Sequence, residues 1–286
     1  MTGREELYMA AVRGIPRRRL SRVVGSWAQL RSRMAVRRFA AALRLDLDEA
    51  EFPLGSYPTV ESLFTRRLRA GARPVDPRPE VLVAPVDGTL NAAGGASSTL
   101  PQAKGRTYTV EALRGGRRAG GRGFEPRSFA TFYLSPRDYH RIHAPVSGRI
   151  EGWTHIPGDL FPVNRTSVER VDAVFARNER VIVHLESESF GGVDVVMVGA
   201  TIVGKIYVSH APELGTNVDH RRAIARHVPP RPVQVEKGEE IGVFGLGSTV
   251  ILLVERRLRG WPEPGAGVRM GTAVASLTHP RSAGRI

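Results

Sequence analysis

A glycine followed by a serine interrupts a strongly apolar stretch of the sequence. The stretch reads Phe244-Gly245-Leu246-Gly247-Ser248-Thr249-Val250, and strand-forming residues follow it directly. Gly247 has no side chain to shield its carbonyl and tolerates torsions closed to other residues, so a tight turn brings the Ser248 hydroxyl onto that carbonyl. Attack there converts the amide to an ester, and β-elimination then splits the chain and leaves a pyruvoyl group in place of Ser248. The pattern predicts self-cleavage between Gly247 and Ser248, although Gly-Ser-Thr is also a common turn.

A serine hydroxyl is a weak nucleophile until a base takes its proton, and the base needs an orienting partner. Tyr139-His140-Arg141-Ile142-His143 supplies two candidate bases, and Asp87 is a candidate orienting carboxylate. Asp87 belongs to a unit, Ala84-Pro85-Val86-Asp87-Gly88, that returns 60 positions later (144 minus 84) as Ala144-Pro145-Val146-Ser147-Gly148. Because repeated units tend to be neighbours in a pseudo-duplicated architecture, we expect His143 and Asp87 to meet near Ser248.

Each of these residues also has a purely structural interpretation. An aspartate such as Asp87 commonly stabilises a turn through its own backbone. His140 and His143 have the spacing of a metal-binding pair, but no third ligand has suitable spacing, so we expect no metal. The chain has no cysteine, which excludes disulfides, thiolate metal sites and thiol nucleophiles. Covalent catalysis must therefore use serine, threonine, lysine or a group made from them.

The elements that must position these residues are mainly strands. From Val81 onward, β-branched runs alternate with glycine and proline. The predicted strand segments are VLVAPVDG, FATFYL, RVIVHL, VDVVMVGATIVGKIYV, EIGVF and STVILLV. We expect an α+β protein with a mainly antiparallel β core, in which the two repeated units are hairpin-like. The Gly-, Ser-, Arg- and Lys-rich residues 96–123 are expected to form a loop-dominated excursion.

A helical segment is predicted before the β core. Apolar residues recur at helical spacing between Leu20 and Leu45, with arginines on the other faces. A further short helix is expected over 60–68, with Thr59 as its N-cap. We therefore divide the chain into a helical membrane-associating segment, 1–75, and a catalytic β-rich domain, 76–286. Packing on the core with a solvated basic face is an equally good interpretation of the helical pattern.

Charge and hydropathy limit the partners of the chain. The 286 residues carry a formal net charge of +14, which favours nucleic acid or an anionic membrane surface as a partner. The arginines are concentrated in the first 44 residues. No apolar window reaches the roughly 18 residues of a spanning helix, and no signal-peptide pattern is present, so we expect a cytoplasmic location. An organellar transit peptide is disfavoured because no cleavage-site signal follows the basic segment.

The motifs together resemble the bacterial phosphatidylserine decarboxylases, which are self-cleaving pyruvoyl enzymes. The resemblance extends from about Leu63 almost to the end and weakens before Leu63, between 209 and 233, and after Val254. It rests on five segments: LGST at 246–249, YLSPRDYHRIH at 133–143, PGDLFPVN at 157–164, FARNERV at 175–181 and VGATIVG at 198–204.

The resemblance implies a triad of Asp87, His143 and Ser248, with His140 near the substrate carboxylate as the candidate proton donor. It implies conversion of phosphatidylserine to phosphatidylethanolamine and CO2 through a Schiff base to covalent pyruvate, the pyruvoyl group made from Ser248. The products of cleavage would be a β chain, 1–247, and an α chain, 248–286, which stay together as a heterodimer and are expected to dimerise further. The expected location is the cytoplasmic side of the cell membrane, as a peripheral protein.

Three other functions fit the sequence less well. A nucleic-acid-binding β-barrel predicts aromatic and basic residues interleaved on a strand face, and no such face is found, so we expect no nucleic acid. A serine hydrolase would carry a G-x-S-x-G elbow, which Gly245-Leu246-Gly247-Ser248 does not supply. A carrier module would show a modifiable lysine at a hairpin tip, and none is evident.

Overall fold

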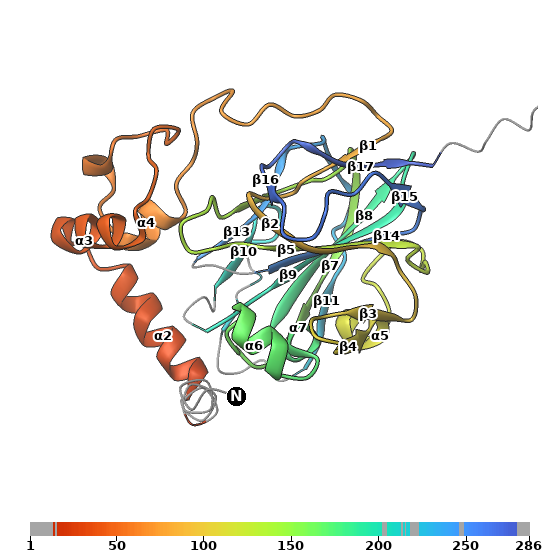
Figure 1. Ribbon diagram of the computed structural model, residues 1–286, viewed down its shortest axis with the longest axis horizontal. Coiled ribbons are helices and arrows are strands. Elements are labelled where there is room, and N and C mark those ends of the chain that lie inside the picture. The colour runs from red at the N-terminus through yellow and green to blue at the C-terminus, as the bar shows by residue number, and fades with distance from the viewer. Residues whose placement is uncertain are drawn as a thin grey trace, which may run out of the picture.

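The computed structural model describes residues 14, 16–201, 205–212, 214, 216–217, 223–245 and 249–278. The protein is α+β, as predicted, with its N-terminal helices at one side of a β core (Figure 1). The helices are α2 (Arg17–Ala28), α3 (Arg33–Leu43), the 3-10 turn η1 (Leu54–Ser56), α4 (Val60–Phe64), α5 (Val110–Arg114), α6 (Arg165–Arg170) and α7 (Val174–Arg177). The strands are β1 (Val81–Val83), β2 (Gly88–Gly95), β3 (Thr99–Pro101), β4 (Thr107–Thr109), β5 (Ser128–Tyr133), β6 (Arg141–His143), β7 (Gly148–Ile156), β8 (Arg180–Ser187), β9 (Gly191–Val198), β10 (Ile206–Val208), β11 (Ala225–His227), β12 (Val233–Val235), β13 (Glu240–Phe244), β14 (Thr249–Val254), β15 (Leu258–Arg259), β16 (Gly267–Val268) and β17 (Ala273–Leu277).

The largest sheet is antiparallel and runs in the order β11-β7-β8-β9-β14-β5-β2-β16, with β12 also paired to β7. Two smaller sheets, β1-β17-β15 and β10-β13-β6, complete the β core. The strand β14 lies at the centre of the large sheet, between β5 and β9, although it comes late in the chain. This central position explains why its sequence, TVILLV, is buried at every residue.

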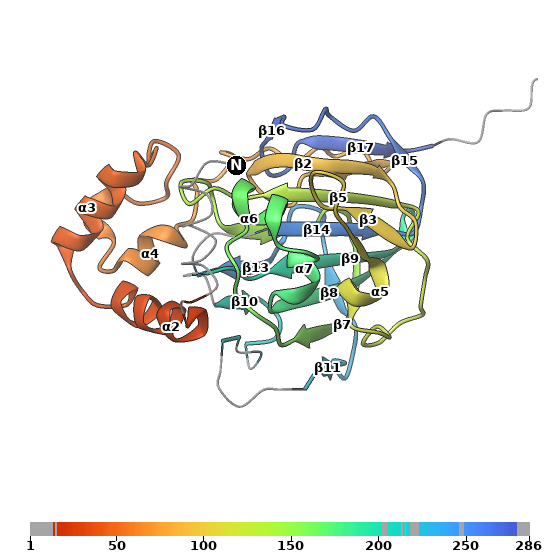
Figure 2. The ribbon, with the colours of Figure 1, turned by 60° about the horizontal axis from the view of Figure 1, so that its bottom comes forward.

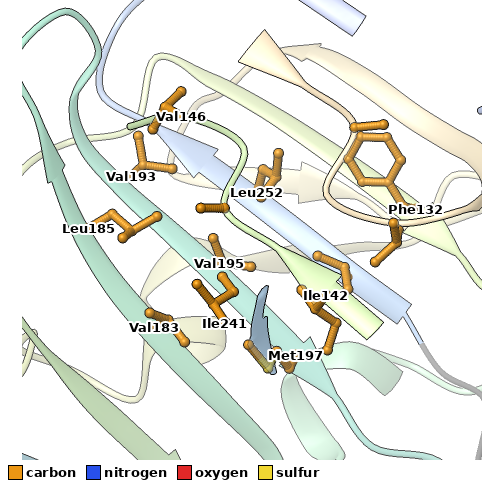
Figure 3. Close-up of a cluster of buried hydrophobic side chains, with 14 of the residues drawn as sticks. Phe132, Ile142, Val146, Val183, Leu185, Val193, Val195, Met197, Ile241 and Leu252 are labelled. Carbon is orange, nitrogen blue, oxygen red and sulfur yellow. The ribbon is translucent and has the colours of Figure 1, made fainter. Parts of the chain in front are cut away.

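Both faces of the large sheet are covered at its centre, so β9 and β14 are buried at every residue and are nearly continuous apolar runs. Val250 and Leu252 of β14 point into a core shared with β6 and β13, where Ile142 and Ile241 also lie (Figure 3). The alternating residue Ile251 points to the opposite face, into a second core. That second core also contains buried side chains of α4, α5, α6 and α7. Helices α5, α6 and α7 lie in front of the strands of the large sheet in Figure 2.

The two repeated units form a pseudo-duplicated pair at the centre of the β core. His143 donates its backbone N–H to Pro85 O at 2.8 Å, and Val83 donates to Pro145 O at 3.1 Å. These two bonds are equivalent under the shift of 60 positions. The strands that follow each unit carry equivalent irregularities of register, between Leu90 and Ala92 in β2 and between Ile150 and Gly152 in β7. The predicted duplication is therefore confirmed.

The units are corners rather than hairpins, which corrects the sequence-based expectation. The strands on either side of the first unit, β1 and β2, do not pair with each other; β1 pairs with β17, and β2 with β5 and β16. The final glycine of each unit is fixed by a close approach, because a Cβ at Gly88 would lie 2.3 Å from Tyr133 O and one at Gly148 would lie 2.4 Å from Glu186 O. Each unit thus carries the chain from one sheet into another.

Helices α2, α3 and α4 form an arm at one side of the β core, which we call the helical arm (Figures 1 and 2). The cap of α4 is as predicted, since Thr59 and Ser62 form a reciprocal capping box, but α4 ends at Phe64 rather than at 68. The expected loop at 96–123 contains the β3-β4 hairpin and α5. Within the described residues, none of the helices has the length and apolar character needed to cross a membrane.

Arginines at the start of α2 attach the helical arm to the β core. The guanidinium of Arg17 lies 3.9 Å above the centre of the Phe161 ring and 3.6 Å from a carboxylate oxygen of Asp159. Arg18 donates to Gly158 O and lies 3.7 Å from the buried Glu179 carboxylate. Part of the basic face of this helix is therefore turned toward the protein.

Candidate active site

His143 lies at the end of β6, beside the first repeated unit, and its side chain is buried. Its Nδ1 lies 2.7 Å from Gly238 O. A carbonyl oxygen only accepts, so Nδ1 carries the proton and Nε2 has a free lone pair. Nε2 accepts a hydrogen bond from the Tyr139 hydroxyl at 3.0 Å. Burial lowers the pKa of His143, which keeps the ring in this neutral form, the form that can act as a base.

Asp87 is held by other partners than the sequence suggested. Arg73 donates to both carboxylate oxygens, at 2.9 and 2.5 Å, and the backbone N–H of Met270 donates at 2.8 Å. Within the described residues, Asp87 and His143 share no hydrogen bond. Asp87 still acts on the ring electrostatically, because its charge raises the pKa of His143 against the larger effect of burial. Asp87 therefore interacts with His143 only through its charge, and the hydrogen bond to Gly238 O fixes the tautomer of the ring.

His140 is fully buried beneath the helical arm. Its ring packs on that of Phe64 in α4, with 3.9 Å between the ring centres. Nδ1 donates to Asp138 O at 2.8 Å, so Nε2 carries the lone pair, and no described residue bonds to it. Burial lowers the pKa of His140 to about 3. His140 is thus a neutral imidazole with a vacant basic nitrogen.

The predicted cleavage site, Gly247 and Ser248, lies outside the described residues. The chain on either side of it is described. Before it, β13 ends at Phe244, whose N–H donates to His140 O at 3.0 Å. After it, β14 begins at Thr249, which pairs with Tyr133 and Val198 of the neighbouring strands. The structure therefore brings the segment that contains His140 and His143 to the strand that leads into the predicted cleavage site.

Sequence reasoning missed three residues that hold the candidate site together: Tyr139, Gly238 and Arg73. Tyr139 stands inside the segment that contains both histidines, so its position carried a signal that was not used. Gly238 acts through its backbone carbonyl, and Arg73 acts through an ion pair with Asp87, 14 positions later. The spacing of residues in the sequence predicts neither contact.

A cavity of about 720 Å³ lies at the second repeated unit rather than at the histidines. Ser147, Gly148 and Lys237 contribute to its lining, and His140 and His143 do not. Ser147 is the counterpart of Asp87, and it accepts the Lys237 N–H at 2.9 Å as Asp87 accepts that of Met270.

Comparison with known proteins identifies close relatives. The family model described as "Phosphatidylserine decarboxylase" matches residues 60–276. The chain is 39% identical over 277 residues to the phosphatidylserine decarboxylase proenzyme of Brevibacillus brevis, covering 95% of this chain and 98% of that protein. It is 41% identical to the proenzyme of the same name from Anaeromyxobacter sp., covering 93% and 97%, and 39% identical to that of Myxococcus xanthus, covering 96% and 99%.

Proposed function

The chain belongs to the phosphatidylserine decarboxylase family and is a lyase, and we propose that it decarboxylates its substrate with a pyruvoyl group made from its own Ser248. The relatives are named as proenzymes, which supports a chain that must be processed before it acts. Phosphatidylserine is the substrate, and phosphatidylethanolamine and CO2 are the products. The finer steps below are inferred from the residues around the candidate site.

In the first stage, His143 Nε2 takes the proton of the Ser248 hydroxyl, whose oxygen attacks the Gly247 carbonyl carbon. The amide C–N bond breaks, the amine regains a proton, and Gly247 becomes esterified to the Ser248 oxygen. Removal of the Ser248 α-proton then expels the Gly247 carboxylate and leaves dehydroalanine. Water hydrolyses the tautomeric imine to the pyruvoyl group and ammonia. The neutral, oriented ring of His143 supports its assignment as the base.

In the second stage, the pyruvoyl keto group would supply the electrophile that binds the substrate amine and withdraws electrons from the bond to the carboxylate. The described residues fit such a group, because a buried imidazole with a vacant Nε2 lies next to the strand that leads to Ser248. His140 holds its lone pair at Nε2, so it would first take a proton there from the substrate ammonium group and then give it to the α-carbon after CO2 leaves. The sequence suggested His140 as a proton donor, and the position of its lone pair makes it a proton carrier instead.

The strand pairing supports a stable heterodimer after cleavage. β14 belongs to the α chain, and both of its neighbours, β5 and β9, belong to the β chain. A buried central strand with two hydrogen-bonded neighbours stays in place when the chain is cut before its first residue. Association of two such heterodimers remains an expectation from the sequence.

A membrane surface is the proposed place of action, on the cytoplasmic side. The helical arm exposes large apolar residues, namely Val23, Trp27, Leu30 and Met34. Exposed arginines lie among them, at 19, 31, 33, 37 and 38. This combination favours an interfacial helix pair on an anionic membrane.

The observation that carries the proposal is the orientation of His143: Nδ1 is fixed on Gly238 O, and Nε2 is left as the base. Denaturing electrophoresis with intact-mass measurement tests it. The purified protein should run as two pieces separated at Gly247, and the smaller piece should lack a free amine and react with carbonyl reagents. Ser248→Ala should remain whole and release no CO2 from phosphatidylserine. A Ser248→Ala protein that decarboxylates the lipid normally would refute the proposal.

A further inference from the structure

Arg66 is a buried cation that forms no ion pair within the described residues, although the charges of Asp87, Asp138 and Asp46 favour its charged form. Its exposed fraction is 5%, and within the described residues its guanidinium makes one hydrogen bond, from Nη2 to Arg137 O at 3.2 Å. Nε and Nη1 are buried and have no partner within the described residues. A guanidinium in the interior is expensive unless it is paired, and burial accordingly lowers the pKa of Arg66. The unpaired Nε and Nη1 are therefore donors that an anionic ligand can use.

The other buried arginines have more partners, although Nη2 of Arg114 is also unpaired within the described residues. Arg180 donates to four backbone carbonyl oxygens, at distances between 2.6 and 2.8 Å. Arg114 pairs with the Asp194 carboxylate at 2.8 Å and also donates to Phe124 O. Among the described arginines that are buried, Arg66 is the one with both a free Nε and a free Nη1. Its vacancy is therefore not a general feature of this fold.

Arg66 and His140 are held side by side. Arg66 donates to the carbonyl of Arg137, and His140 donates to the next carbonyl along the chain, that of Asp138. Phe64, two residues before Arg66, packs directly on the His140 ring. The vacant donors of Arg66 thus belong to the same small region as the vacant Nε2 of His140.

Tyr57 adds a further vacant group to this region. Its hydroxyl is buried and has no hydrogen-bond partner within the described residues. It belongs to the same apolar cluster as Phe64, which lies two residues before Arg66. The Nε and Nη1 groups of Arg66 and the hydroxyl of Tyr57 are therefore unpaired donors of the kind that an anion accepts.

We propose that Arg66, assisted by Tyr57, binds the phosphodiester group of the lipid substrate. This inference rests on the proposed function, since it concerns the substrate of that site. Only a few bonds separate the phosphate of a serine phospholipid from the α-carbon, so a phosphate ligand must lie beside the residue that carries the proton. A guanidinium presents a planar set of donors that suits two phosphate oxygens.

The substrate carboxylate is the less suitable occupant. Decarboxylation converts a charged carboxylate into neutral CO2, so an arginine bound to it would stabilise the ground state more than the transition state. The phosphate keeps its charge throughout the reaction. An arginine on the phosphate therefore holds the substrate without raising the barrier.

The test compares two substrates in enzyme that has already been cleaved. One is a short-chain phosphatidylserine, and the other is O-hexyl-L-serine, which has the amine and the carboxylate but no phosphate. Activities are normalised to the amount of reactive carbonyl ends. Arg66→Gln should raise KM for the phospholipid about tenfold to a hundredfold, with kcat nearly unchanged, because the lost interaction is the same in the ground and transition states. Its kcat/KM for O-hexyl-L-serine should stay within about twofold of wild type.

Three further variants define the interaction. Arg66→Lys keeps the charge but loses the planar donor set, so its KM should lie between those of wild type and Arg66→Gln. Tyr57→Phe should raise KM about threefold to tenfold, the effect of one hydrogen bond. Arg67→Gln is the matched control, because Arg67 is exposed in the same loop, and it should behave as wild type.

Binding without catalysis gives an independent readout. Dihexanoyl-phosphatidylglycerol has a phosphodiester and no amine, and calorimetry should show at least tenfold weaker binding to Arg66→Gln than to wild type. Equal losses of kcat/KM on both substrates, or unchanged binding of this lipid, would overturn the assignment of Arg66. A wild-type protein that stays whole and releases no CO2 would instead overturn the proposed function, so the two failures are distinguishable.

Discussion

The chemistry of the candidate site depends on which nitrogen of each histidine is free. Both rings donate from Nδ1 to a backbone carbonyl, Gly238 O for His143 and Asp138 O for His140, and both leave Nε2 as the basic atom. The two histidines differ in the hydrogen bonds made at Nε2, and we propose different roles for them: base in self-cleavage for His143 and proton carrier in decarboxylation for His140. His143 Nε2 bears one hydrogen bond, from Tyr139, whereas His140 Nε2 has none within the described residues.

Tyr139→Phe tests the role of His143. The Tyr139 hydroxyl occupies the lone pair that must accept the serine proton, while its ring stacks on the imidazole. Phenylalanine keeps the stacking and frees Nε2, so we expect self-cleavage to become about fivefold faster, the effect of about 1 kcal/mol of lost competing hydrogen bond. The rate is read from the disappearance of full-length chain after synthesis in vitro. His143→Ala should remain uncut, and slower cleavage by Tyr139→Phe would show that the hydroxyl orients the base instead.

The buried neutral state of His140 predicts a dependence of stability on pH. Its pKa is about 3 in the folded protein and about 6.5 in an unfolded chain. The unfolded state therefore binds the proton first, and stability is lost as the pH falls from about 6.5 toward 3, on the order of 1 kcal/mol per pH unit. Between pH 7.5 and pH 5 this contributes about 2 kcal/mol.

Urea unfolding of the uncut Ser248→Ala protein measures this effect. His140→Gln in the same background keeps a donor for Asp138 O but cannot titrate, so its loss of stability between pH 7.5 and pH 5 should be smaller by about 2 kcal/mol. The comparison uses only the pH difference, which removes any general cost of the substitution. Equal losses in the two proteins would mean that His140 titrates normally when folded.

At the scale of elements, local patterns predicted the strands and the caps but not their partners. The apolar runs at 81–83, 128–133 and 249–254 are strands, and Thr59 caps α4 as expected. The sequence of each repeated unit suggests a hairpin, because the pattern of strand, turn and strand is the same whether the two strands pair with each other or with other strands. β1 pairs with β17, almost 200 positions later, and no local pattern records that choice.

Because local patterns do not record distant partners, the sequence predicted the residue types of the candidate site but not all of their contacts. The types of Asp87, His140 and His143 suggested chemistry, and the repeat correctly made the two segments neighbours. The partners of Asp87 and the inward orientation of Arg17 and Arg18 depend on residues far along the chain, such as Met270, Asp159 and Glu179. Spacing carries no information about contacts of this kind.

At the scale of the whole molecule, the helical arm links an exposed apolar surface to the candidate site. Phe39 of α3 packs edge-on against Phe64 of α4, with 6.2 Å between ring centres, and Phe64 packs on His140. α4 also contacts the β core through Glu61, which accepts a hydrogen bond from the Tyr207 hydroxyl at 2.8 Å. A lipid entering from the side of the arm would therefore reach His140 past these rings.

This arrangement predicts that apolar insertion and charge attraction contribute separately to membrane binding. Trp27, Leu30 and Met34 are exposed, so glutamine at all three positions should leave folding intact while weakening sedimentation with phosphatidylcholine and phosphatidylglycerol vesicles about tenfold or more, at low and at high salt. Arg37→Gln with Arg38→Gln should weaken binding by a similar factor at low salt only, since their attraction is screened. Both variants should decarboxylate a short-chain soluble phosphatidylserine as wild type does. Unchanged sedimentation of the triple variant would mean that the exposed face of the arm is simply solvated, and that the lipid reaches His140 without help from this surface.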